Sequence, residues 1–197
     1  APQSAAPRLD PKRTSALPTH IEHIAPAVIG IHVEVPPDRP SAATLGAERW
    51  GSGVLFDAAG YALTVSYVLL DAARVDVVLR DGRKVGAKVA GLDLESGLGV
   101  IKLDGQGPWP AAALGDSTRI AVGDVTGTVG MDEDGSLVGT PGSVKSIKPF
   151  AASWEYMLDR ALFVAPYNSA FGGAALVDQT GALVGITSLR LGEAPFV

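Results

Sequence analysis

The amino-acid sequence predicts an all-β protein whose short strands fall into two groups. Apolar and polar side chains alternate with a period of two over many short stretches, which is the pattern of half-buried strands. The 197 residues include 24 glycines and 14 prolines, which supply frequent turns between those stretches. A segment near residues 104–122 separates the two groups. Short, evenly spaced strands are typical of barrels and sandwiches, so we expect one barrel on each side of this segment.

Each group consists of stretches rich in β-branched and apolar residues. The N-terminal barrel, about residues 27–104, is expected to hold strands within residues 27–35, 51–57, 61–70, 74–93 and 97–103. The C-terminal barrel, about residues 122–192, is expected to hold strands within residues 125–131, 140–148, 161–166, 173–178 and 182–191. The pair Asp81-Gly82 predicts a tight hairpin, because Asp-Gly tolerates the positive φ angles of such turns.

The first residues differ in composition from the rest of the chain. Residues 1–19 carry Pro, Ser and Ala without an aromatic side chain, which predicts an extended, mobile arm before a domain at residues 20–197. A short helix should open this domain, with Thr19 as its N-cap and Pro26 at its end. The start lacks Met and fits equally the product of export-signal cleavage and an arbitrary boundary of the chain.

Charge and composition exclude several classes of protein. The net charge is −5 and no basic run is present, so nucleic acid is not an expected partner. No apolar stretch approaches the ~18 residues that a membrane-spanning helix needs. The absence of cysteine excludes disulfides, thiolate catalysis and zinc-cysteine sites.

Four segments, in order and at similar spacing, resemble the trypsin-like proteases of the HtrA/DegP type. They are residues 51–68, 77–103, 112–124 and 168–186. The resemblance covers about residues 20–190. It implies a chymotrypsin/trypsin-like fold, with two antiparallel six-stranded barrels and an active cleft between them. No part of the 197 residues corresponds to the family's usual C-terminal PDZ domain.

The family's catalytic residues do not carry over to this sequence. The resemblance aligns its catalytic His with Tyr67, its Asp with Gly97 and its nucleophile with Gly172. The glycine that shapes the oxyanion hole is matched by Ala170, and a family Asn is matched by Asn168. Serine acyl transfer needs a hydroxyl activated by a base that a third group orients. A phenol with a reference pKa of about 10 cannot take that proton at neutral pH, and glycine has no side chain to attack or orient with. We therefore expect a degenerate pseudoprotease.

Two alternatives remain open at this stage. A hydrolase with a displaced nucleophile would use Ser169, although the chain's histidines, His20, His23 and His32, all precede or sit on the first strand. Lys145 or Lys148 would then have to act as the base, without a sequence signature around either.

A metal-binding protein would use His20 and His23, which are spaced for one helical face, together with Glu22 or Asp10. Degenerate HtrA-like proteins of magnetosomes resemble this pattern of triad loss and are linked to metal, which keeps the alternative open. His32 is instead expected to be an exposed strand residue. The acidic run at residues 131–136 lacks the late bidentate Glu of a calcium loop and predicts a solvated turn.

Aromatic residues concentrate before the aligned nucleophile. A candidate partner-binding set consists of Phe150, Trp154, Tyr156 and Phe171. The alternative is that these side chains, together with Met157 and Phe163, fill a pocket as part of the core. The function we expect is that of a binding or scaffold subunit in a periplasmic or otherwise extracytoplasmic bacterial assembly, with other protein subunits as partners and no cofactor. The resemblance to the family implies trimers that are built on aromatic contacts near the N-terminus. Residues 1–30 have no Phe, Trp or Tyr, so a self-trimer is not expected.

Tyr67 carries one further expectation. A phenol is longer than an imidazole, and the two aligned glycines remove the side chains that it would meet. We expect the ring to lie across the vacated site, with its hydroxyl bonded to backbone or water.

Overall fold

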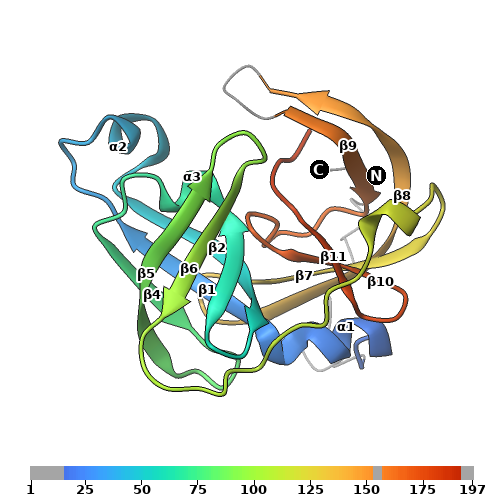
Figure 1. Cartoon of the computed structure of the whole chain (residues 1–197), viewed down its shortest axis with the longest axis horizontal. Coiled ribbons are helices and arrows are strands. Elements are labelled where there is room, and N and C mark those ends of the chain that lie inside the picture. The colour runs from blue at the N-terminus through green and yellow to red at the C-terminus, as the bar shows by residue number, and fades with distance from the viewer. Residues whose placement is uncertain (1–15, 153–156, 192–197) are drawn as a thin grey trace, which may run out of the picture.

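The computed structural model describes residues 16–152 and 157–191, which form two antiparallel β-structures side by side (Figure 1). The first is a closed barrel with the strand order β1-β2-β3-β6-β5-β4. Its strands are β1 Val28–Glu34, β2 Glu48–Asp57, β3 Tyr61–Val65, β4 Arg74–Val78, β5 Lys84–Asp93 and β6 Leu98–Leu103. All six overlap the stretches where the alternating pattern predicts them, but β2 begins at Glu48, before the expected residue 51, and Ser66–Leu69 of the expected stretch 61–70 form a helix instead. The turn at Gly82, with φ at +85°, joins β4 to β5 and confirms the predicted hairpin.

The second structure is a five-stranded sheet with the order β11-β10-β7-β8-β9. Its strands are β7 Val125–Met131, β8 Leu137–Ala151, β9 Met157–Ala165, β10 Ala175–Asp178 and β11 Leu183–Ile186. The five strands expected from the sequence are confirmed. The sixth strand, which the resemblance implied, is absent from the described residues. The last strand ends at Ile186 because Thr187 turns back, exchanging backbone hydrogen bonds with Gly173 and Ala174.

Short helices close the ends of the two structures. They are α1 Thr19–Ile24, η1 Ala25–Ala27, α2 Pro40–Leu45, α3 Ser66–Leu69 and η2 Ser117–Arg119. None of the helices within the described ranges is long and apolar enough to span a membrane. Thr19 is the first residue of α1, and Pro18 occupies the N-cap position without a side-chain cap, which corrects the predicted N-cap.

The arm predicted at residues 1–19 is described only from Ala16 onward. Leu17 packs against the buried core, close to the backbone of Gly139. The carbonyl of Pro18 accepts hydrogen bonds from the backbone N–H groups of Ile21 and Glu22. The last residues of the predicted arm therefore belong to the folded domain. One cluster of buried apolar side chains, which includes Ile21 and Val28 beside Val129 and Val177, runs through both β-structures.

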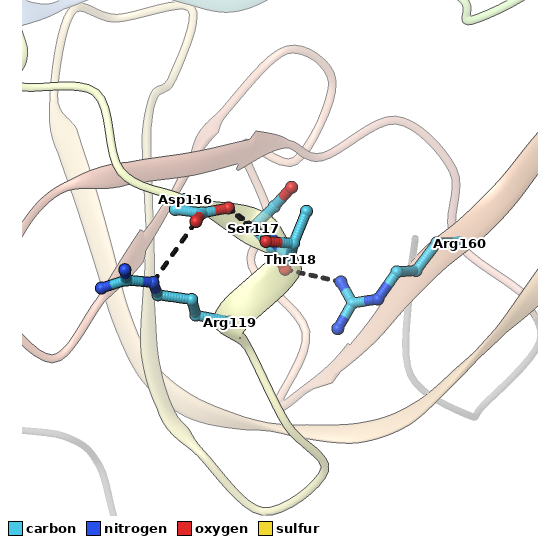
Figure 2. A network of polar contacts seen from close by, with 5 residues as sticks. All are labelled: Asp116, Ser117, Thr118, Arg119 and Arg160. Atoms are coloured by element: carbon cyan, nitrogen blue, oxygen red, sulfur yellow. Dashed lines mark hydrogen bonds and ion pairs between the residues drawn. The ribbon is translucent and has the colours of Figure 1, made fainter.

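The segment that connects the two β-structures is held by hydrogen bonds and ion pairs at η2 (Figure 2). Asp116 accepts hydrogen bonds from the Thr118 hydroxyl at 2.6 Å and the Thr118 N–H at 3.0 Å, and these bonds lower the pKa of Asp116. Arg119 lies 3.4 Å from the same carboxylate. Arg160, on β9, donates to the carbonyls of Ser117, at 2.6 Å, and Ile120. The connecting segment is thus fixed to the edge of the second sheet.

Candidate functional site

Two of the three aligned catalytic positions, Tyr67 and Gly172, meet between the two β-structures. Tyr67 lies on α3, and its hydroxyl donates a 2.9 Å hydrogen bond to the carbonyl of Ser188. A Cβ placed on Gly172 would lie 3.0 Å from that hydroxyl oxygen. The half-buried ring therefore reaches across to the backbone of residue 172, and the expected bond to backbone is confirmed.

The acid position of the triad is also brought to α3. The carbonyl of Gly97 accepts a 2.8 Å hydrogen bond from the N–H of Ser66, the first residue of α3. Gly97 is buried and its φ angle is +76°. This is the left-handed region, where a side-chain-bearing residue is strained by roughly 1–2 kcal/mol. The backbone at this position thus favours the glycine that it carries.

Arg49 on β2 is the residue that holds α3 in place, and sequence reasoning missed it. Its side chain is 6% exposed and donates to the carbonyls of Tyr67, at 3.0 Å, and Leu70, at 2.8 Å. The same guanidinium donates to Gly46 and to the hydroxyl of Ser41 on α2. Burial lowers the pKa of Arg49 from its ordinary value, and the charge of a nearby Asp opposes that shift. One cation therefore joins β2, α2 and α3.

The loop that carries Gly172 is shaped by Asn168. This side chain is 1% exposed and donates to the carbonyls of Thr128, at 2.9 Å, and Val138, at 3.1 Å. Its Oδ1 atom accepts the N–H of Ala170 at 2.8 Å. An oxyanion hole uses the N–H of the nucleophile residue and that of the residue two before it. Here the N–H of Ala170, two residues before Gly172, already donates to Asn168 within the loop.

Replacing Asn168 by Ala should lower the free energy of unfolding by about 2 kcal/mol. The change leaves two buried carbonyls and one N–H without their partner, and each unmet buried group costs roughly 1–3 kcal/mol before relaxation. Urea unfolding of both proteins measures the difference. Asn168→Asp is a second test variant: it keeps the acceptor for Ala170 but places a carboxylate oxygen opposite the carbonyls of Thr128 and Val138, so it should also lower the free energy of unfolding. An unchanged midpoint in the Ala variant would contradict this role.

Gly173 lets the two β-structures approach closely beside the site. Its φ angle is +85°, and a Cβ there would lie 2.1 Å from the carbonyl oxygen of Ser52. The N–H of Ser52 donates to the carbonyl of Gly172 at 2.7 Å. The hydroxyl of Ser52 contacts the second structure as well, since it accepts the N–H of Met131 at 2.9 Å and lies 3.1 Å from the carbonyl of Ala170.

Two cavities flank the Tyr67 ring, which lines both of them. The larger has a volume of about 720 Å³ and is mostly apolar, with Leu45, Leu94 and Leu189 among its lining residues. The smaller has a volume of about 320 Å³ and lies over the loop at residues 169–172. Trp50 and the acidic turn that follows β7 complete the smaller cavity.

The model of the trypsin-like peptidase domain matches residues 51–186, which include the strands and loops that form this site. The chain belongs to the trypsin-like peptidase family. This trypsin-like domain is 28% identical over 191 residues to the periplasmic pH-dependent serine endoprotease DegQ of Escherichia coli K12, covering 87% of the chain and 41% of DegQ. It is 34% identical over 142 residues to the periplasmic serine endoprotease DegP of Salmonella typhimurium LT2, covering 72% of the chain and 30% of DegP.

Solved structures give the same assignment. The HtrA-type protease AlgW, determined with a tripeptide, superposes with a TM-score of 0.73 at 29% identity, covering 90% of this chain and 56% of AlgW. The resemblance to HtrA/DegP proteins predicted from the sequence is confirmed. The trypsin-like domain spans less than half the length of the DegQ and DegP chains that it matches.

Ser169, the candidate displaced nucleophile, is exposed and lines the smaller cavity of the trypsin-like domain. None of the three histidines lines that cavity. His20 lies on α1 with its Nε2 atom 3.4 Å from the carbonyl of Thr126, and His23 has its Nδ1 atom 3.4 Å from the carbonyl of Thr180. Lys145 and Lys148 lie on β8 and do not line the cavity either. Among the described residues, neither a histidine nor Lys145 or Lys148, the bases considered from the sequence, is brought to the cavity that Ser169 lines.

Among the described residues, the predicted metal ligands His20 and His23 are not part of a group of three or more possible ligands. Asp10 lies outside the described residues. Among the described residues, the group that could hold a metal consists of His32, Glu34 and Asp76, on β1 and β4. Arg74 already pairs with it, 2.8 Å from Asp76 and 3.7 Å from Glu34. His32 is half-buried rather than exposed because its ring stacks on Trp50, with ring centroids 4.4 Å apart.

The predicted aromatic set is divided by the structure. Trp154 and Tyr156 lie outside the described residues. Phe150 is half-buried and packs edge-to-face on the buried Phe163, with ring centroids 6.1 Å apart, which makes it part of a small core. Phe171 is half-buried beside Tyr167 and lines the smaller cavity. Phe171 is therefore the member of the set that the structure brings to the site.

Proposed function

We propose that this trypsin-like domain has no peptidase activity and works as a binding or scaffold subunit of an extracytoplasmic protein assembly. The observation that carries the proposal is the Tyr67 hydroxyl, which donates to the Ser188 carbonyl and lies within 3.0 Å of any Cβ at position 172. A phenol used as a donor in this way is not a general base. A nucleophile at residue 172 would also have to displace the ring.

The positions aligned with the catalytic Asp and with the nucleophile also support the absence of peptidase activity. Gly97 and Gly172 offer neither a carboxylate nor a hydroxyl, and the N–H of Ala170 is bonded to Asn168. Disabling the triad of a serine protease costs ~10⁶ in turnover. The residual catalysis, ~10³ to 10⁴ over water, depends on an intact oxyanion hole. A domain without the triad and without an intact oxyanion hole has no remaining source of catalytic rate enhancement.

The relatives support the location and the kind of partner. DegQ and DegP are named as periplasmic endoproteases, and AlgW was solved with peptides. A domain that keeps their framework and lacks their triad is suited to hold a polypeptide without cutting it. Other protein subunits are accordingly the proposed partners. Ser169 in the smaller cavity is the observation that keeps a hydrolase with a displaced nucleophile as the second candidate.

The purified protein is expected to leave casein intact and to resist labelling by a fluorophosphonate probe, in an assay where DegQ is active. The test compares the native chain with Ser169→Ala and with Ser117→Ala, an exposed serine on η2 that serves as the matched control. Cleavage or labelling that Ser169→Ala abolishes and Ser117→Ala preserves would replace the proposal by the displaced-nucleophile reading. No turnover in all three proteins supports it.

A further inference from the structure

The acidic turn between β7 and β8 is held in a fixed shape by its own hydrogen bonds. The N–H of Asp132 donates to the carbonyl of Ser136, and the N–H of Gly135 donates to the carbonyl of Asp132, both at 2.9 Å. The carboxylate of Asp134 accepts the N–H of Ser136 at 2.8 Å, and this bond lowers the pKa of Asp134. One of the three acidic side chains of the turn therefore serves to build it.

The other two acidic side chains, Asp132 and Glu133, line the smaller cavity. Within the described part of the chain, neither carboxylate has a hydrogen-bond or ion-pair partner, and no Lys or Arg lines this cavity. This differs from the turns at Asp81 and Asp116, whose carboxylates bond within their own turn and pair with a neighbouring arginine. The cavity thus carries two negative charges that the described residues leave uncompensated.

Aromatic surface faces the same space. Trp50 is 39% exposed and lines the cavity, while His32 stacks against its ring. Phe171 lines the cavity from the opposite β-structure. An aromatic face attracts an ammonium or guanidinium group, and it also packs against the alkyl stem of a Lys or Arg side chain.

The cavity does not need to form when a ligand arrives, because its base is already fixed. Ser52 bonds to Met131, at the root of the acidic turn, and to Gly172 in the facing loop. Ser52 is 1% exposed. These bonds set the distance between the acidic turn and the loop at residues 169–172, so the charges and aromatic rings keep their relative positions. A pre-formed site loses little free energy to ordering when it binds.

We propose that this cavity takes a Lys or Arg side chain from a basic, extended segment of a partner protein. The charged head would lie at Asp132 and Glu133, and the alkyl stem would lie against Trp50 and Phe171. The proposal rests on the proposed function, since it names the chemistry of the polypeptide that the site holds. The net charge of −5 on the chain favours the approach of such a segment.

Fluorescence anisotropy with two labelled peptides tests the proposal. One peptide alternates Ala and Lys, and the other replaces each Lys by norleucine, which keeps most of the alkyl stem and loses the charge. The native chain should bind only the Lys peptide, more weakly as salt rises. Asp132→Asn combined with Glu133→Gln should weaken binding by about fivefold or more. Glu22→Gln with Asp159→Asn is the matched control, because it removes two exposed charges on α1 and β9.

The outcomes separate the site from the proposed function. Loss of affinity confined to the cavity variant, with a further loss on Trp50→Leu, supports the site. Absence of Lys-dependent binding, or equal weakening by both double variants, would overturn it, and the lack of peptidase activity would still stand. Cleavage of a bound Lys peptide would keep the site and defeat the proposed function. Thermal melting of each variant checks that the exposed substitutions leave the fold intact.

Discussion

Arg49→Ala is expected to lower the free energy of unfolding by about 3 kcal/mol or more. The substitution removes the donors that serve the carbonyls of Gly46, Tyr67 and Leu70 and the hydroxyl of Ser41. Hydrogen bonds to a charged group contribute roughly 1.5–3 kcal/mol each, and acceptors left buried without a partner add a penalty. Urea unfolding measures the loss. Because α3 would lose its anchor, the two cavities beside Tyr67 should also change shape.

Two control variants separate the geometry of Arg49 from its charge. Arg49→Lys keeps a cation but cannot serve four acceptors in a planar fork, so an intermediate loss of stability is expected. Arg83→Ala removes an exposed arginine that pairs with Asp81, and it should leave the unfolding curve nearly unchanged. If Arg49→Ala and Arg83→Ala lowered the free energy of unfolding equally, the buried hydrogen bonds of Arg49 would contribute no more to stability than a surface ion pair.

Tyr67→Ala is expected to cost about 3 kcal/mol, because large aromatic side chains in packed sites lose both buried area and the volume that they filled. The half-buried ring packs against the main core cluster and divides the two cavities. Tyr67→Phe keeps the ring and removes only the bond to Ser188, so about 1 kcal/mol is expected. Thermal and urea unfolding of both variants measure the two contributions.

Tyr61→Ala is the matched comparison for that series. Tyr61 is 37% exposed on β3, and its ring contacts only the surface cation of Lys102 among the described aromatic and cationic pairs. Its removal should change the melting temperature little. If Tyr67→Ala were as mild as Tyr61→Ala, the ring would not be a structural element of the site.

The sequence was sufficient for the parts of the fold that depend on local pattern. The alternation of apolar and polar residues predicts β1 through β6, and Asp81-Gly82 predicts the hairpin. Both signals are local, because the face on which a strand residue lies and the geometry of a tight turn depend on residues that are neighbours in the sequence. That the described residues of the second sheet contain no sixth strand was not predictable in this way. Residues after Ile186 are apolar enough for a strand, but tertiary bonds at Thr187 and the acceptor role of Ser188 decide their course.

The aligned positions of the candidate site could be proposed from the sequence, but the residues that hold them in place could not. The aligned positions Tyr67, Gly97 and Gly172 do come together around α3. Arg49 resembles a surface arginine at the start of a strand, and only its pairing with the buried Val33 shows that it points inward. The β7–β8 turn was predicted to be solvated, and Glu133 and Asp134 are exposed. Nothing local in the sequence reveals that Asp132 and Glu133 also line the smaller cavity.

The way Arg49 holds α3 has a consequence for how the site can change over evolution. Its bonds to α3 end on the main-chain oxygens of Tyr67 and Leu70, and every amino acid carries such an oxygen. The bonds from Arg49 to the helix therefore do not depend on which side chain residue 67 carries. A substitution there alters what projects into the groove without releasing the helix that presents it. A scaffold anchored in this manner can lose one chemistry and acquire another while its architecture persists.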